Sequence, residues 1–234
     1  MIEELDLETY LCISSNEFEI CLFNKKHLTN LYINKIQIYN DPDYIDYNTL
    51  DKFLKDNIFK IEKLSGNFIK KIFLIIENKE DSQIKFGIKK KNYKNTITKK
   101  FLENFLIDAR DLFRENYKNH HIMHILIDRY FENGKYHLSF NEGFRGDYLC
   151  VEFQFKYIST NFISEINKAL KKYQIELAGC LDGRYIKNFF IGEQIQYSEM
   201  IYKIRNGFNG NEVKLISRNY EKKGFFEKFF QLFS

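Results

Sequence analysis

The spacing of hydrophobic and polar residues changes several times along the chain, and each change predicts a new element. Alternation between Thr9 and Phe23 indicates two strands joined near 14–16, and 27–39 favours a third strand. Asn48 or Thr49 begins a helical pattern that ends at 65–67. Residues 69–76 then form a continuous hydrophobic run, which is typical of a strand buried on both faces.

The middle of the chain, 84–178, also contains strand and helix patterns, but in a different order. A strand at 84–88 precedes a helix with one hydrophobic stripe between Phe101 and Phe113, capped by Thr96 or Thr98. Strands at 122–127 and 136–140 surround Asn133-Gly134, a strong hairpin signal. A long strand at 148–158, a helix from Ser159 or Thr160 and a short strand at 175–177 follow. We expect an α/β chain with an α+β segment in its middle.

Composition adds only limits. The chain has 234 residues, 36 basic and 32 acidic side chains and a net charge of +4, so an acidic partner is permitted but not required. The four cysteines form no C-x-x-C pair, which indicates neither a zinc site nor a disulfide scaffold. The acidic N-terminus is unlike a secretory signal, and no hydrophobic run reaches the ~18 residues of a membrane span. These features predict a cytoplasmic protein with reduced thiols.

Several short motifs carry a resemblance. The segment Met123-His124-Ile125 and Tyr130 precede the run Asn141-Glu142-Gly143-Phe144-Arg145-Gly146. Ile158-Ser159-Thr160 and Ile175-Glu176-Leu177 follow. Their order resembles the subdomain inserted into FtsA, the bacterial cell-division relative of actin, with Glu142 where that family has proline. We therefore expect a shortened actin-like or ribonuclease-H-like fold, with 1–83 and 179–217 as the core, 84–178 as the FtsA-type insertion and 218–234 as a tail.

The resemblance also directs attention to the first predicted turn, where the family holds phosphate and metal in Asp-Ile-Gly-Thr-Ser/Thr-Lys. This chain has no glycine and no lysine there, and its last residue is an acid that repels phosphate; the residues are Cys12, Ser14, Ser15, Asn16 and Glu17. A glycine-rich second phosphate loop is also missing, since Cys180-Leu181-Asp182-Gly183-Arg184 stands in its place. We expect no ATPase activity, no cofactor and no metal.

Two segments are candidate contact sites. The tail places its phenylalanines at helical spacing behind a basic lead-in, which favours binding to an anionic membrane, although packing on the parent domain is an equal alternative from the pattern alone. Its residues are Lys222, Lys223, Phe225, Phe226, Lys228, Phe229, Phe230, Leu232 and Phe233. The resemblance favours the membrane. It also implies a protein-contact loop at Asn141, Gly143, Arg145 and Gly146, whose glycines are expected to supply positive φ.

The resemblance therefore implies a non-catalytic cell-division scaffold, peripheral on the inner face of the plasma membrane at the division site. Its expected partners are FtsZ or membrane division proteins, anionic lipid and further copies of itself. The alternative is a type IV pilus assembly scaffold resembling PilM, on the cytoplasmic side of the inner membrane, which lacks such a tail. An enzyme or a nucleic-acid module is the third hypothesis.

The residues on which that third hypothesis would depend are weaker candidates. His120, His121 and His124 could be metal ligands, but their spacing spans a predicted helix end and strand start. The acidic pairs Asp128 with Glu132 and Asp108 with Asp111 look like ordinary charged faces. Lys89-Lys90-Lys91 beside Tyr93 is a basic patch with an aromatic residue, which a solvated loop explains as well as nucleic acid does. We expect no nucleic-acid partner.

Overall fold

The computed structural model describes residues 6–38, 45–77, 82–93, 96–140 and 144–213. The chain forms two compact units. Unit 1 comprises 1–81 and 161–206, and unit 2 comprises 82–160 and 207–234.

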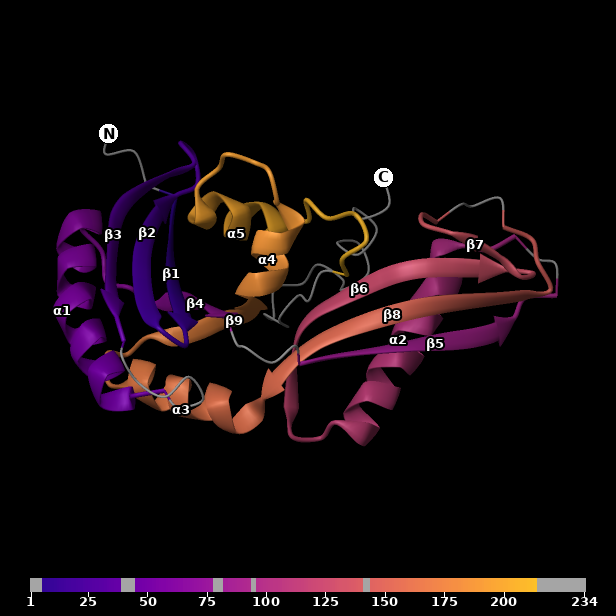
Figure 1. The fold of residues 1–234 in the computed structure, drawn as a ribbon, viewed down its shortest axis with the longest axis horizontal. Helices are drawn as coiled ribbons and strands as arrows, with labels where there is room; N and C mark the ends of the chain where they lie inside the picture. Colours follow the sequence, from indigo (N-terminus) through magenta and orange to yellow (C-terminus); the bar gives the residue numbers. More distant parts are fainter. Residues whose placement is uncertain (1–5, 39–44, 78–81, 94–95, 141–143, 214–234) are drawn as a thin grey trace. The chain divides into compact units, whose positions relative to one another are not determined.

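Unit 1 is built on a five-stranded sheet in the order β3-β2-β1-β4-β9 (Figure 1). Strands β1, β4 and β9 run parallel, whereas β1, β2 and β3 form an antiparallel meander. Its elements are β1 (Leu7–Ser14), β2 (Glu17–Asn24), β3 (Thr29–Gln37), α1 (Tyr47–Ser65), β4 (Lys71–Glu77), α3 (Thr160–Lys171), β9 (Glu176–Asp182), α4 (Gly183–Phe189) and α5 (Tyr197–Arg205).

Helices cover both faces of this sheet, which explains the continuous hydrophobic runs 10–13 in β1 and 72–76 in β4. On one face Phe18 of β2 packs against Phe53 of α1. On the other face Phe23 of β2 packs against Tyr202 of α5. Helix α1 begins at the Asp46 cap and ends at Gly66, whose φ of 70° closes the helix as predicted.

Unit 2 contains a four-stranded antiparallel sheet in the order β5-β8-β6-β7, packed on one long helix. Thr98 caps that helix, and Asn133 and Gly134 both have positive φ in the β6–β7 turn, as the sequence predicts. The elements are β5 (Gln83–Lys91), α2 (Lys99–Asn116), β6 (His120–Glu132), β7 (Lys135–His137) and β8 (Tyr148–Ser159).

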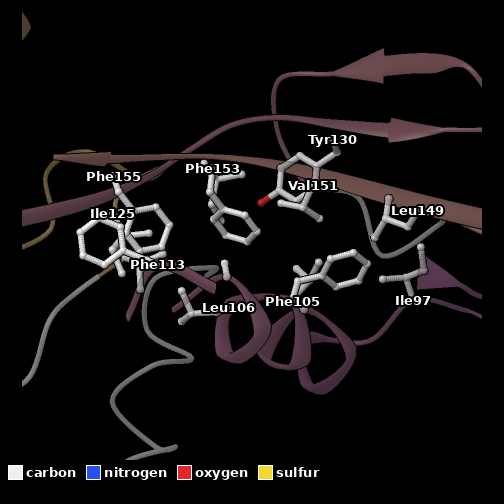
Figure 2. Close-up of a cluster of buried hydrophobic side chains, with 14 of the residues drawn as sticks. Ile97, Phe105, Leu106, Phe113, Ile125, Tyr130, Leu149, Val151, Phe153 and Phe155 are labelled. Atoms are coloured by element: carbon white, nitrogen blue, oxygen red, sulfur yellow. The ribbon is translucent and has the colours of Figure 1, made fainter. Parts of the chain in front are cut away.

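The core of unit 2 lies between α2 and the sheet and combines aromatic rings with aliphatic side chains (Figure 2). Phe113 of α2 stacks on Phe155 of β8 with ring centroids 5.1 Å apart. Phe105 and Phe153 are also fully buried there. Ring stacking adds about 0.5–1.5 kcal/mol to the hydrophobic burial of such a pair.

The α/β class is confirmed, and the sheet of unit 1 has the predicted opening of two or three strands, a helix and a buried strand. The unit boundaries differ from those predicted. Residues 161–178 lie in unit 1, because β9, which continues from 176, pairs with β4. Residues 207–213 lie in unit 2, because they bond to β6. Helix α4 was not predicted from the sequence.

Candidate functional site

The carboxyl ends of the parallel strands in unit 1 are the candidate site, because ligands of open α/β sheets bind at such ends. Ser14 at the end of β1 pairs in register with Glu77 at the end of β4. Asp182 at the end of β9 pairs with Ile76, next to Glu77. Three polar side chains from distant parts of the sequence thus meet at one edge of the sheet.

The turn between β1 and β2 is closed by its own side chains. The Ser14 hydroxyl donates to Asn16 Oδ1 at 2.9 Å and accepts from the Glu17 N–H at 3.0 Å. The Glu17 carboxylate accepts from Gln37 Nε2 at 2.7 Å. Ser15 is partly buried beside them. The polar groups of the turn therefore bond mainly to one another. Its only charged side chain, Glu17, is negative and would repel a phosphate.

Cys12 lies behind this turn and is buried, so it is part of the core. Burial raises the pKa of its thiol well above the usual value, with smaller contributions from Cys21 and Glu19. Such a thiol stays protonated at neutral pH and is a poor nucleophile or metal ligand.

The second corner of the edge is formed by Asp182 and Gly183. The Asp182 carboxylate caps α4 by accepting from the Tyr185 N–H at 3.0 Å. A Cβ on Gly183 would clash with the Tyr197 hydroxyl and lie 2.6 Å from Cγ of Glu77. Glycine is needed here because neighbouring side chains crowd its Cα atom.

Lys187 places a positive charge beside Glu77. Lys187 Nζ lies 2.7 Å from Glu77 Oε1 and 4.6 Å from the centre of the Tyr197 ring. The Tyr197 hydroxyl oxygen is buried, and burial first, then Cys12 and Glu77, raises its pKa well above normal. Tyr197 and Lys187 thus fill the corner where a phosphate would have to approach Gly183.

The weaker candidates are used structurally. Asp128 pairs with Lys85 at 2.6 Å, and Asp108 pairs with Lys90 at 2.6 Å. Glu212 lies 2.5 Å from the buried ring of His124. Among the described residues, no three or more His, Cys, Asp or Glu side chains are grouped so as to hold a metal ion.

His120 and His121 are not placed together as ligands either. The His120 ring packs against Tyr157 with centroids 4.9 Å apart. Burial lowers the pKa of His121, so this histidine favours its neutral form. The His120 ring therefore has a packing role in unit 2, whereas the His121 side chain is exposed at the surface of the strand.

The predicted protein-contact loop is folded back on the β6–β7 hairpin. The Glu132 carboxylate accepts from the backbone N–H groups of Arg145 and Gly146 at 2.6 and 2.7 Å. Gly146 does not have positive φ, contrary to prediction; it is glycine because a Cβ would lie 2.7 Å from Glu132 Cγ. The Arg145 side chain is exposed, whereas Asn141 and Gly143 lie outside the described residues.

The tail lies beyond the described residues too, so its nine predicted membrane-binding positions from Lys222 to Phe233 stay a prediction. Within the described part of the chain, no helix is both long enough and hydrophobic enough to span a membrane. Sequence reasoning missed Glu77, Lys187 and Tyr197. Of these three, only Glu77 could have been found from the sequence, because it directly follows the hydrophobic run 69–76.

Proteins similar to this chain are found among solved structures. No protein-family model and no curated protein matches the sequence. Solved structures do match. A Bacteroides thetaiotaomicron protein with an actin-like ATPase fold and unknown function is 13% identical, with 82% of this chain and 59% of that chain covered and a TM-score of 0.34.

Two further structures belong to assemblies. A PilM–PilN type IV pilus biogenesis complex matches at 9% identity over 79% of this chain and 49% of its own, with a TM-score of 0.47. The cytoplasmic domain of EpsL, an inner-membrane component of the Vibrio cholerae type II secretion system, matches at 8% identity over 77% and 57%, with a TM-score of 0.36. The chain thus spans about half of the length of these structures, and likeness at this level assigns no family or function.

Proposed function

We propose that this chain is a non-catalytic scaffold of the FtsA type that acts in cell division. Its unit 1 is an actin-like core without nucleotide binding, and its unit 2 contacts other division proteins. Residues 218–234 attach it to the inner face of the plasma membrane. The division role is supported by the sequence motifs of 122–178 and by the tail.

The observation that carries the non-catalytic part is the filled corner at Gly183. Phosphate sites of this kind need backbone N–H groups that a ligand can approach, often with a nearby cation. Here the approach to Gly183 is taken by the Tyr197 hydroxyl and Glu77, and Lys187 is paired with Glu77. The turn at Ser14 adds a carboxylate rather than a cation.

To test this part, the purified full chain is mixed with ATP and Mg²⁺. Binding is measured by isothermal titration calorimetry, and turnover is measured by phosphate release. We expect neither a saturable heat nor turnover. Saturable binding that is weakened by Ser14→Ala or by Gly183→Asp would place nucleotide at this edge and overturn the non-catalytic assignment.

The membrane part is tested separately by vesicle flotation. Burying a phenylalanine contributes roughly 1.5–3 kcal/mol before ordering costs, so replacing two of them has a large effect. We expect the full chain to float with anionic vesicles, and the chain ending at Tyr220 or carrying Phe229→Glu and Phe230→Glu to stay behind. Gln231→Glu, a charge change on the polar face of the same predicted helix, is the control. Equal recovery of all forms would remove the membrane from the proposal.

A further inference from the structure

Strand β5 forms one edge of the sheet in unit 2, with β8 on its inner side. Two hydrogen bonds show which way its backbone groups point: Asn92 N–H donates to the Asp147 carbonyl, and Tyr157 N–H donates to the Ser82 carbonyl. In an antiparallel pair, residues alternate between bonding the neighbour and pointing away from it. The register of β5 is continuous, so the odd-numbered residues face outward; they are Gln83, Lys85, Gly87, Lys89 and Lys91.

The side chains of these residues lie on the face of the sheet opposite the core. Ile84, Phe86 and Ile88, the alternate set, pack against the aromatic core. Lys89 and Lys91 are exposed on the outer face. Lys89 and Lys91 therefore combine backbone groups that point away from β8 with a positive charge.

The lysines of β5 differ in how their charges are compensated. Lys85 pairs with Asp128, and Lys90 turns toward α2, where it pairs with Asp108. Lys89 and Lys91 have no ion pair with any residue that the structure describes. Instead their ammonium groups lie 4.6 and 6.0 Å from the centre of the Tyr148 ring.

The edge of β6 that faces away from β8 shows that short extended segments can bond to this sheet. Strand β6 bonds β7 at Tyr130–Glu132, and at Ile125–Ile127 it bonds Asn211–Val213 of the same chain. Its edge is thus partly covered by short added segments. Within the described residues, no backbone hydrogen bond joins another segment to the outer edge of β5.

We propose that the free edge of β5 binds an extended acidic segment of another protein as an added antiparallel strand. Its acidic side chains would stand at alternate positions, opposite Lys89 and Lys91. Residues opposite each other in such a pair place their side chains on the same face, with Cβ atoms about 4.5–5.5 Å apart, so carboxylates meet the uncompensated ammonium groups. The edge offers alternating donors and acceptors, which a peptide matches and a phosphate backbone does not.

This inference deepens the proposed scaffold function, since it names the chemistry of one partner of unit 2. It is independent of the nucleotide and membrane experiments. A Lys89→Glu and Lys91→Glu variant should still float with vesicles and should still give no heat with ATP, so failure of peptide binding is distinguishable from failure of the scaffold assignment.

The test is fluorescence anisotropy of a labelled peptide of nine residues, the length of β5, that alternates glutamate with threonine. We expect salt-sensitive binding to the full chain, weakened about tenfold or more by Lys89→Glu with Lys91→Glu. The matched control is Lys52→Glu with Lys55→Glu, the same charge change on two exposed lysines of α1, which should leave binding unchanged. Equal weakening by both double variants would reduce the effect to net charge and overturn the proposal.

Modified peptides separate strand addition from charge attraction without any change to the protein. N-methylation of the glutamates blocks the N–H groups that would face β5, whereas N-methylation of the threonines blocks only those that face away. We expect the first peptide to lose binding and the second to keep it. Equal binding of both would overturn the added strand, and tighter binding of a short oligothymidine at Lys89 and Lys91 would assign the surface to nucleic acid instead.

Discussion

The strand-end corner of unit 1 and the β5 edge of unit 2 both gather charged side chains, yet they treat the charges differently. In the corner, Glu77 is paired with Lys187, and the space beside Gly183 is filled by Tyr197. On β5, Lys89 and Lys91 lie exposed over Tyr148. The difference is made by segments that arrive from elsewhere in the chain: α4 and α5 close the corner, while no described segment forms backbone hydrogen bonds to the outer edge of β5. A charged residue at a sheet edge is available to a partner only where such a segment is absent.

The largest effect is expected where a segment of the chain, Asn211–Val213, covers the edge of β6. Glu212→Ala removes the carboxylate 2.5 Å from Nδ1 of the fully buried His124 and loosens a segment held by the Val213 N–H bond to the Ile125 carbonyl. Leaving a buried polar group without this partner costs about 1–3 kcal/mol. We expect a loss of that size in the free energy of unfolding in urea, with faster hydrogen exchange at the Val213 amide.

The control for this variant is Glu115→Ala, an exposed glutamate of α2 in the same unit. Surface changes of this kind stay within about 0.5 kcal/mol. Similar losses in the two variants would mean that Glu212 does not hold the segment on β6.

The closed corner of unit 1 is tested by Gly183→Ala. Helix propensity alone would favour alanine here by roughly 0.5–1 kcal/mol. The added Cβ would clash with the Tyr197 hydroxyl and lie 2.9 Å from Ile75 Cγ2, and such overpacking costs about 1–3 kcal/mol. We expect a net loss of about 1–2 kcal/mol in urea unfolding, because overpacking exceeds propensity.

Two further variants sharpen this result. Adding Tyr197→Phe to Gly183→Ala should recover part of the loss, because it removes the clashing oxygen. Gly210→Ala, at a glycine with no heavy atom within 4 Å of a built Cβ, should change stability by no more than about 0.5 kcal/mol. A stable Gly183→Ala protein would show that the corner has room for a ligand.

Local patterns predicted most of the elements because each depends on residues close in sequence. The Thr98 cap, the Asn133-Gly134 turn and the hydrophobic run that became β4 are of this kind. The start of α3 at Thr160 was also read correctly. What could not be read locally was the unit to which α3 belongs, since that depends on the pairing of β9 with β4, more than a hundred residues apart in sequence.

The candidate site shows the same limit. The sequence indicated that the turn at Ser14 lacks the glycine and lysine of a phosphate loop, and the structure describes a self-bonded turn there. It could not indicate that Tyr197 reaches Gly183, or that Glu132 bonds the Arg145 and Gly146 amides. These contacts join segments whose spacing obeys no local period, so only the folded chain brings them together.

Glu19 of β2 in unit 1 is expected to make the stability of the protein depend on pH. Partial burial raises the pKa of Glu19, and nearby Lys35 offsets this only in part. A raised folded-state pKa means that the folded protein binds the proton more tightly than the unfolded chain, so Glu19 lowers stability as pH rises above its unfolded value of about 4.3. We expect Glu19→Gln to raise the melting temperature at neutral pH, with a gain that shrinks on acidification and disappears below about pH 4. A gain that grows in acid would contradict this assignment.

The smallest expected effect is a difference in stability between substitutions of the inward-facing and the outward-facing lysines of β5. Lys90 pairs with Asp108, donates to the Asn104 carbonyl at 3.0 Å and lies over the Phe105 ring, so Lys90→Ala loses both packing and an ion pair. Partly exposed pairs contribute about 0.2–1 kcal/mol, and we expect a loss in that range. Lys91→Ala removes an exposed charge without an ion pair among the described residues and should leave the free energy of unfolding unchanged while it weakens acidic-peptide binding. The opposite order, stability lost at Lys91 and kept at Lys90, would mean that the outward lysines serve the fold and not a partner.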